Sequence, residues 1–167
     1  MPHRNVTDPA EIESLARDAL AARALPIPMT AGERRRWQDR FNAIPGMTYL
    51  GCTLDISDER VVAVHLPEIE AHHQGGLGTD AVNGAVLAGF FDCALGVAGV
   101  LQFPRRRAGT VELSIKFMRP TRGDSLTAYA VALKRSQNLC FVESELYCGN
   151  RLCAVATGMV STAAQPA

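Results

Sequence analysis

Residues 81–103 read AVNGAVLAGFFDCALGVAGVLQF. Asp92 is the only charge in this stretch, and Asn83 and Gln102 are its only other polar side chains. Length and apolarity alone would suit a membrane span, but the stretch is solitary, lacks basic residues on its N-terminal side and carries Asp92 near its centre. A helix that is apolar all round is also what a protein buries inside a sheet. We therefore expect a single central helix covered by strands.

The segments on either side predict that sheet. Apolar side chains recur at every second residue in 47–56 and 60–66 before the helix, and in 109–118, 125–134, 139–148 and 152–162 after it. A loop rich in Gly and His, residues 67–82, leads into the helix. A hairpin followed by four consecutive strands favours a largely antiparallel sheet. The predicted class is α+β: a curved antiparallel sheet of about six strands wrapped around one long helix, the hotdog arrangement.

The first 45 residues form a predicted N-terminal helical extension. Thr7-Asp8-Pro9 has the capping residue and early proline of a helix start, and the apolar periodicity continues to about Ala24. A second helix is expected from about residue 31 to residue 42, with Trp37 and Phe41 on its apolar side and Arg34, Arg35, Arg36 and Arg40 solvated. Residues 46–162 then form a single domain, and 163–167 are a tail.

Composition excludes several classes of protein. The 167 residues contain 17 Lys+Arg and 17 Asp+Glu, and 47% are hydrophobic. The chain is therefore neither disordered nor charged enough to attract nucleic acid or an anionic membrane. Five cysteines without a C-x-x-C pair, and an N-terminus without an apolar signal core, predict reduced thiols in a cytoplasmic protein. No His/Cys cluster has the spacing of a metal site, so we expect no metal.

The uncovered side of the central helix predicts an oligomer. Six strands cannot surround a helix that is apolar on every side, so the remaining side should pack on a second copy of the chain. Asp92 on this helix has two interpretations. It is either a buried carboxylate tied to a Thr or Arg of a neighbouring strand, or a general base or nucleophile in a semi-dry cleft.

The start of the helix, Asn83-Gly84-Ala85, also has two interpretations. Its unpaired N–H groups could hold an acyl carbonyl, or Asn83 could simply cap a closely packed helix. Asn83 and Asp92 are nine residues apart, about 180° around and 13.5 Å along a helix. One reacting carbonyl therefore cannot touch both in one chain. If both residues act, the active site lies between subunits.

Three runs of sequence resemble a known family. They are GTDAVNGA (78–85) followed after five residues by FDCALG (91–96), TVELSIKFMRP (110–120) and GDSL (123–126). Together they resemble the hotdog-fold acyl-CoA thioesterases of the PaaI-like, phenylacetyl-CoA thioesterase type, over about residues 46–162. The family's loop motif is His-Gly-Gly, and the match places Asn83, Gly84 and Ala85 on it. The family's catalytic carboxylate falls on Asp92.

The resemblance implies that an acyl-CoA thioester is hydrolysed. The Gly84 amide, with Ala85 or Asn83, would polarise the carbonyl, and Asp92 from the partner subunit would activate water or attack directly. Gln74 is the candidate for positioning the thioester or water. Arg135, Ser136 and Asn138 match the family's CoA-contacting region, and Arg106 within the run Arg105-Arg106-Arg107 is a second candidate. Coenzyme A would be part of the substrate, and no cofactor is implied.

Departures from the family pattern leave alternatives open. Asn83 can donate and accept like a neutral His but cannot titrate near neutrality, and Ala85 adds a methyl group, so we expect slow or substrate-restricted hydrolysis. A sensor or carrier that binds acyl-CoA without cleaving it is the main alternative. A hotdog hydratase is a weaker one, because His72-His73 lacks the matching acidic motif. A dimer or a dimer of dimers fits either function.

Overall fold

The computed structural model describes residues 9–76 and 80–163. Three helices come first: α1 (Pro9–Ala21), α2 (Ala31–Asn42) and α3 (Pro45–Leu50). Strands β1 (Thr53–Asp55) and β2 (Val61–Leu66), the short helix η1 (Ala71–His73) and strands β3 (Gln74–Gly76) and β4 (Ala81–Val82) follow. The central helix α4 (Gly84–Val100) precedes β5 (Ala108–Phe117), β6 (Leu126–Arg135), β7 (Leu139–Cys148) and β8 (Arg151–Thr162).

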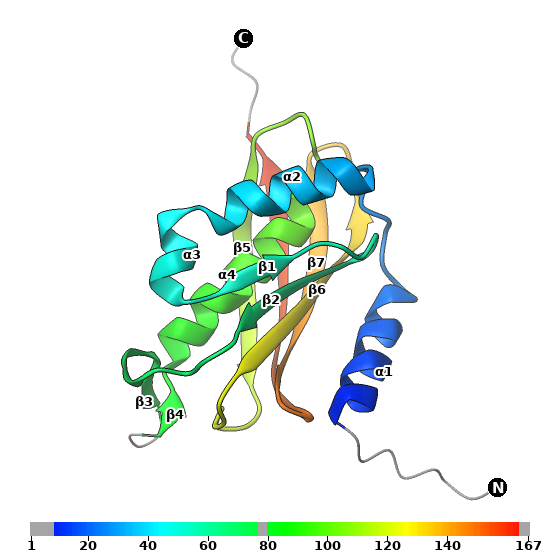
Figure 1. Cartoon of the computed structure of the whole chain (residues 1–167). Coiled ribbons are helices and arrows are strands. Elements are labelled where there is room, and N and C mark those ends of the chain that lie inside the picture. Colours follow the sequence, from blue (N-terminus) through cyan, green and yellow to red (C-terminus); the bar gives the residue numbers. More distant parts are fainter. Residues whose placement is uncertain (1–8, 77–79, 164–167) are drawn as a thin grey trace, which may run out of the picture.

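The main sheet has six strands in the order β1-β2-β6-β7-β8-β5, and every neighbouring pair is antiparallel. The sheet curves around α4, and α2 and α3 lie on the same side of the sheet as that helix (Figure 1). The predicted fold, a helix wrapped by an antiparallel sheet with an N-terminal helical part, is confirmed. Among the described residues, no helix combines the length and apolarity needed to cross a membrane.

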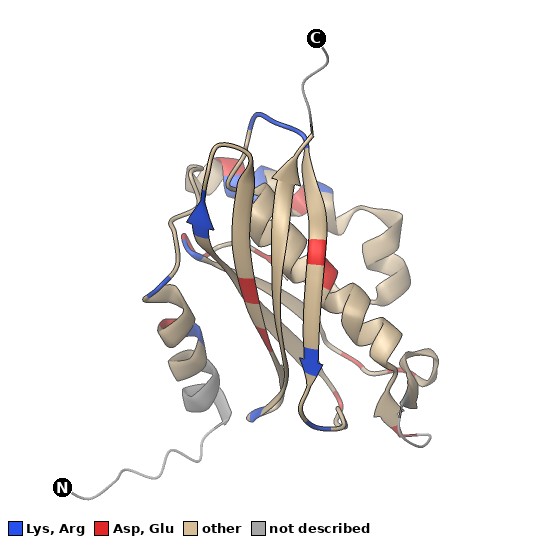
Figure 2. Cartoon of the chain, turned by 180° about the vertical axis from the view of Figure 1, so that it is seen from behind, with Lys and Arg blue, Asp and Glu red and all other residues tan. Residues whose placement is uncertain are grey.

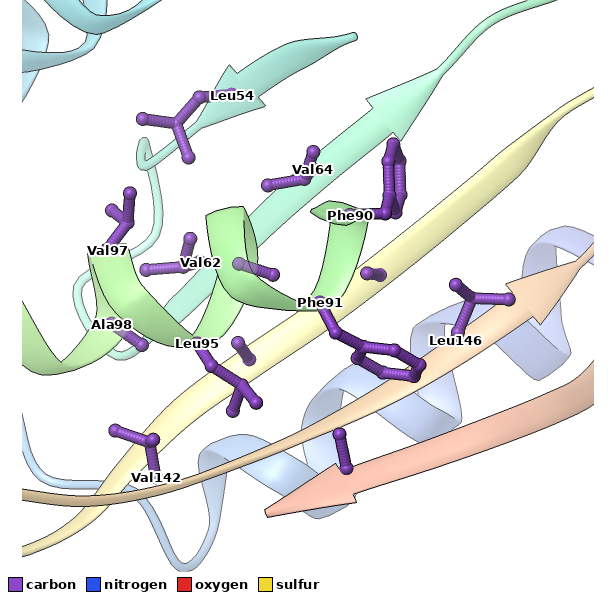
Figure 3. Packing of buried hydrophobic residues seen from close by; sticks show 14 of the residues in the cluster. Leu54, Val62, Val64, Phe90, Phe91, Leu95, Val97, Ala98, Val142 and Leu146 are labelled. Atoms are coloured by element: carbon purple, nitrogen blue, oxygen red, sulfur yellow. The ribbon is translucent and has the colours of Figure 1, made fainter. Parts of the chain in front are cut away.

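One side of α4 forms the core. Phe90, Phe91 and Leu95 are fully buried and face Val62, Val64, Val142 and Leu146 on the strands (Figure 3). The helix lies so close to β8 that a Cβ built on Gly99 would come within 2.4 Å of the Val160 side chain. Close packing of this kind tolerates little added volume. Gly99 therefore lets α4 lie deep in the sheet.

The outer face of the sheet carries α1. Leu20 and Ala24 pack there on Tyr129, Val131 and Tyr147 in a separate apolar cluster. Arg23 forms ion pairs with the carboxylates of Glu143 and Glu145 on β7. The extension is therefore attached to both sides of the sheet, with α1 outside it and α2 on the side of α4 (Figure 1).

Three local predictions were wrong. Residues 47–50 form helix α3 instead of a strand, because Pro45 suits its first turn and Gly51 ends it at φ 65°. Residues 67–82 contain η1 and the β3–β4 pair, where only a loop was predicted. Arg34 is buried and donates to the carbonyl oxygens of Met29, Ile56 and Ser57, although it was expected to be solvated.

The depth of α4 in the sheet yields a stability prediction. Gly99→Ala should lower the free energy of unfolding by about 1–3 kcal/mol, because its methyl group would overlap Val160. Gly46→Ala is the matched control, since a Cβ at this helical position meets nothing within 4 Å. Urea denaturation of both variants measures the difference. Equal stability of the two would contradict the close approach of α4 to β8.

Candidate active site at the start of the central helix

Asn83 begins α4 as its N-cap. Its side-chain Oδ1 accepts a hydrogen bond from the Ala85 N–H at 2.8 Å. The Ala85 amide is therefore already used, whereas the N–H of Gly84 meets no acceptor among the described residues. Of the two backbone amides considered for a substrate carbonyl, Gly84 is the one that remains free.

Gln74, the predicted positioning residue, lies beside this helix start. It belongs to β3 and pairs with Val82 of β4, the residue before Asn83. The backbone N–H of Asn83 donates to the carbonyl oxygen of His73 at 2.8 Å, which fixes η1 against the same point. The β3–β4 pairing therefore holds Gln74 next to the residue that precedes the Asn83 cap.

A cavity of about 330 Å³ opens next to Gly84. Its lining is mostly apolar and comes from the start of α4 and the segment after β5: Ala81, Val82, Gly84, Leu87, Phe117, Met118, Arg119, Pro120 and Thr121. A Cβ built on Gly84 would lie 3.7 Å from the Phe117 ring, so this aromatic side chain borders the free amide. The cavity is large enough for a compact acyl or aryl group.

Asp92 lies on the side of α4 that the sheet leaves uncovered. Its side chain is exposed in the single chain and has no hydrogen bond or ion pair within the described ranges. The interpretation of Asp92 as a buried carboxylate tied to a neighbouring strand is therefore wrong. Gly96 and Thr110 lie next to Asp92. A Cβ built on Gly96 would be 4.0 Å from the Asp92 Oδ1 and 3.0 Å from the Thr110 Oγ1.

The surface around Asp92 combines a smooth helix face with an unpaired strand edge. The helix residues are small and exposed or half-buried: Ala85, Ala88, Gly89, Cys93 and Gly96. Beside them β5 forms the edge of the sheet, with Val111 60% and Phe117 55% exposed. Exposed apolar side chains on an edge strand, beside an uncovered helix face, form a surface that proteins usually cover, and Glu112 and Lys116 are exposed charges along the same strand. It is consistent with the predicted second copy.

Cys93, next to Asp92, lies beside the buried thiol of Cys52, whose Sγ donates to the Met47 sulfur at 3.7 Å. The contact between the two thiols lowers the pKa of Cys93, and the same contact and burial raise the pKa of Cys52. All five cysteines are free thiols. The contact joins the end of α3 to the middle of α4, and neither sequence spacing nor periodicity signals it.

The predicted CoA-contacting residues gather at the other end of α4. Arg106, Arg135 and Ser136 line a second cavity of about 380 Å³. The Arg106 guanidinium donates to the Gln137 carbonyl, the Asn138 Oδ1 and the Thr162 Oγ1, and the Ser136 hydroxyl bonds within its own turn. Arg106, Ser136 and Asn138 therefore stabilise the loops of this end, which Figure 2 shows as basic.

Distance along the helix separates the two groups of residues. Gln102, at the second cavity, lies about 27 Å along the axis from Gly84 but only about 15 Å from Asp92. Within one chain the basic end of α4 is therefore remote from the free amide. In a site shared between two subunits, this basic end would have to come from the same subunit as Asp92.

Comparison with known proteins identifies the family. The profile of the thioesterase superfamily matches residues 80–155, which include both Asn83 and Asp92. An esterase candidate from Pseudomonas aeruginosa is 30% identical over 128 residues, which cover 74% of this chain and 92% of that protein. The chain belongs to the thioesterase superfamily. The N-terminal helices α1 and α2 lie outside the residues that the superfamily profile matches.

Solved structures have the same fold as this superfamily member. The E. coli PaaI protein from the phenylacetic acid degradation operon aligns with a TM-score of 0.67 at 19% identity, over 87% of this chain and 96% of its own. A thioesterase family protein from Silicibacter pomeroyi gives 0.69 at 20% identity, over 81% and 100%. At these identities the likeness establishes the fold, and the site rests on the residues described above.

The cap at Asn83 can be separated from any catalytic role. Asn83→Ala should cost about 1 kcal/mol of stability through loss of the cap, whereas Asn83→Asp should keep it, because Asp caps helices as well as Asn. Urea midpoints of the two variants test this difference. If Asn83→Asp unfolds as easily as Asn83→Ala, the Oδ1 contact with Ala85 does not stabilise the helix start.

Proposed function

We propose that this protein hydrolyses a thioester of coenzyme A at a site formed by two copies of the chain. The observation that carries the proposal is the unpaired Asp92 carboxylate, which lies exposed on the same helix as the free Gly84 amide. Membership of the thioesterase superfamily supports this type of reaction.

The carbonyl oxygen of the thioester accepts a hydrogen bond from the backbone N–H of Gly84. The positive end of the α4 dipole adds to the stabilisation of the negative charge that develops on this oxygen. The acyl group occupies the adjoining cavity, between Leu87 and Phe117. A small apolar cavity favours a compact acyl or aryl group over a long chain.

Asp92 of the partner subunit completes the site. Gly84 and Asp92 are about 12 Å apart along one helix, too far for both to touch one carbonyl carbon. Antiparallel packing of two α4 helices, centred near Ala88, would bring each Gly84 opposite the partner's Asp92. The small residues on this face permit such close packing. The proposed oligomer is therefore required by the chemistry as well as by the uncovered surface.

Hydrolysis then follows in two steps. Asp92 accepts a proton from water as the water oxygen bonds to the thioester carbon, and the resulting oxyanion is held by Gly84. The carbon–sulfur bond breaks, and the CoA thiolate leaves and takes up a proton. Direct attack by the carboxylate, through an anhydride that water later cleaves, uses the same two groups. Neither route requires a metal or an additional cofactor.

Binding without hydrolysis is the second candidate function. It is favoured by the Asn83 cap, because the Ala85 amide is already occupied and only the Gly84 amide is free for an oxyanion. Most of the rate acceleration in such sites comes from donors aimed at the developing charge. Release of free thiol from acyl-CoA distinguishes the two functions.

Asp92→Asn should reduce kcat/KM for the best acyl-CoA by about 10²- to 10⁴-fold, the usual contribution of a general base. The measurement is free-thiol release from a panel of short-chain and aryl acyl-CoA esters. Asp39→Asn, which removes a carboxylate from α2, is the control and should retain full activity. Unchanged turnover in Asp92→Asn, or no turnover of any ester by the wild type, would contradict the proposal.

A further inference from the structure

A third cavity lies on α2, outside the residues that match the superfamily profile. It has a volume of about 210 Å³ and is lined by Trp37, Arg40, Phe41 and Ile44. The indole and phenyl rings are stacked, with centroids 5.4 Å apart and planes within 15° of each other. Both rings are half-buried, while Arg40 and Ile44 are exposed. The cavity therefore presents aromatic surface beside a guanidinium group.

Positive charge surrounds this aromatic surface. Arg40 lies on the same side of α2 as Trp37, three residues after it, and Arg36 lies one turn before Arg40 and flanks that side. The pKa of Glu33, one turn earlier, is lowered by hydrogen bonds from Thr30 and further by the charges of Arg36 and Arg105. Arg105, which lines the second cavity after α4, is near enough for its charge to act on Glu33.

The three arginines keep donors available for a ligand. Among the described residues, none of Arg36, Arg40 and Arg105 is within salt-bridge distance of a carboxylate. Arg40 donates its Nε to the Arg36 carbonyl oxygen at 3.3 Å, which leaves its terminal nitrogens free. Glu33 is held by Thr30 in a capping box. The Glu33 carboxylate offsets part of the charge, and the three arginines leave the local charge positive.

Aromatic surface next to unpaired arginines matches one class of ligand. Purine rings stack on Trp and Phe side chains, and guanidinium groups bind phosphate oxygens with two parallel hydrogen bonds. We infer that this cavity binds the nucleotide end of coenzyme A, with adenine on the Trp37 side and the phosphates at Arg40 and the neighbouring Arg36. The inference rests on the proposed function for the identity of the ligand.

Trp37 allows a direct test, because it is the only tryptophan in the chain. Adding 3′-phosphoadenosine 5′-diphosphate, the nucleotide portion of coenzyme A, to the full-length protein should quench its fluorescence saturably. Pantetheine, which lacks the nucleotide, should leave the fluorescence unchanged. Since neither compound is a thioester, the titration is independent of catalysis.

Two matched variants separate specific contacts from general electrostatics. Arg40→Gln should weaken nucleotide binding about tenfold or more, because a hydrogen bond to a charged phosphate is lost. Arg35→Gln removes the same charge from the opposite side of α2, about 160° from Trp37, and should change the affinity less than about twofold. Both variants keep the buried Arg34 and the capping box, so the helix should fold.

Three outcomes would overturn the inference. The first is no quenching by the nucleotide at millimolar concentration, and the second is equal loss of nucleotide affinity in Arg35→Gln and Arg40→Gln. The third is a fluorescence change that depends on protein concentration and not on nucleotide concentration, which would mark the cavity as a contact between copies of the chain. Saturable nucleotide binding without any thioester hydrolysis would support the inference while contradicting the proposed function. Hydrolysis without a Trp37 response would do the reverse.

Discussion

The packing of α4 is the constraint on which the rest of the structure depends. One curved sheet can cover only part of a helix that is apolar nearly all round, so the strands enclose the side of Phe90, Phe91 and Leu95 and leave the other side open. Because Gly99 has no side chain, the helix can approach Val160 of β8 closely. Asp92 is the charged residue of α4, and it lies on the side of the helix that the strands leave uncovered.

This division separates the two proposed chemical functions along one helix. The N-terminal end offers a backbone amide and a cavity, and the middle offers a carboxylate about 12 Å away. A rigid helix cannot shorten that distance. The same uncovered face that favours a second copy therefore also makes a shared site the simplest way to bring the amide and the carboxylate to one carbonyl.

Much of the fold could be predicted from the sequence because its signals are periodic. Alternation of apolar residues located the five long strands, and the apolar run 81–103 located α4. The prediction failed at Met47–Leu50, where Pro45 and Gly51 delimit a helix that alternating side chains did not exclude. It failed again at Arg34, whose three carbonyl acceptors come from segments up to 23 residues away.

The candidate site was less predictable, because it depends on contacts that no spacing encodes. Asn83 was recognised as either a cap or a catalytic group, and only the Oδ1 contact with Ala85 establishes the cap. Asp92 could have been buried or exposed, since its environment depends on which side of α4 the sheet covers. Periodicity placed Trp37 and Phe41 on one side of α2, but that these rings leave a cavity beside Arg40 could be seen only in the structure.

Complementation between two inactive variants tests the shared site most directly. Gly84→Pro removes the free amide at a helix position where proline is well tolerated, Gly84→Ala is its control, and Asp92→Asn removes the carboxylate. Mixed dimers of Gly84→Pro and Asp92→Asn subunits contain one site with both groups intact, so a randomised equal mixture should regain about a quarter of wild-type activity. A mixture no more active than either variant alone would contradict a site shared between subunits.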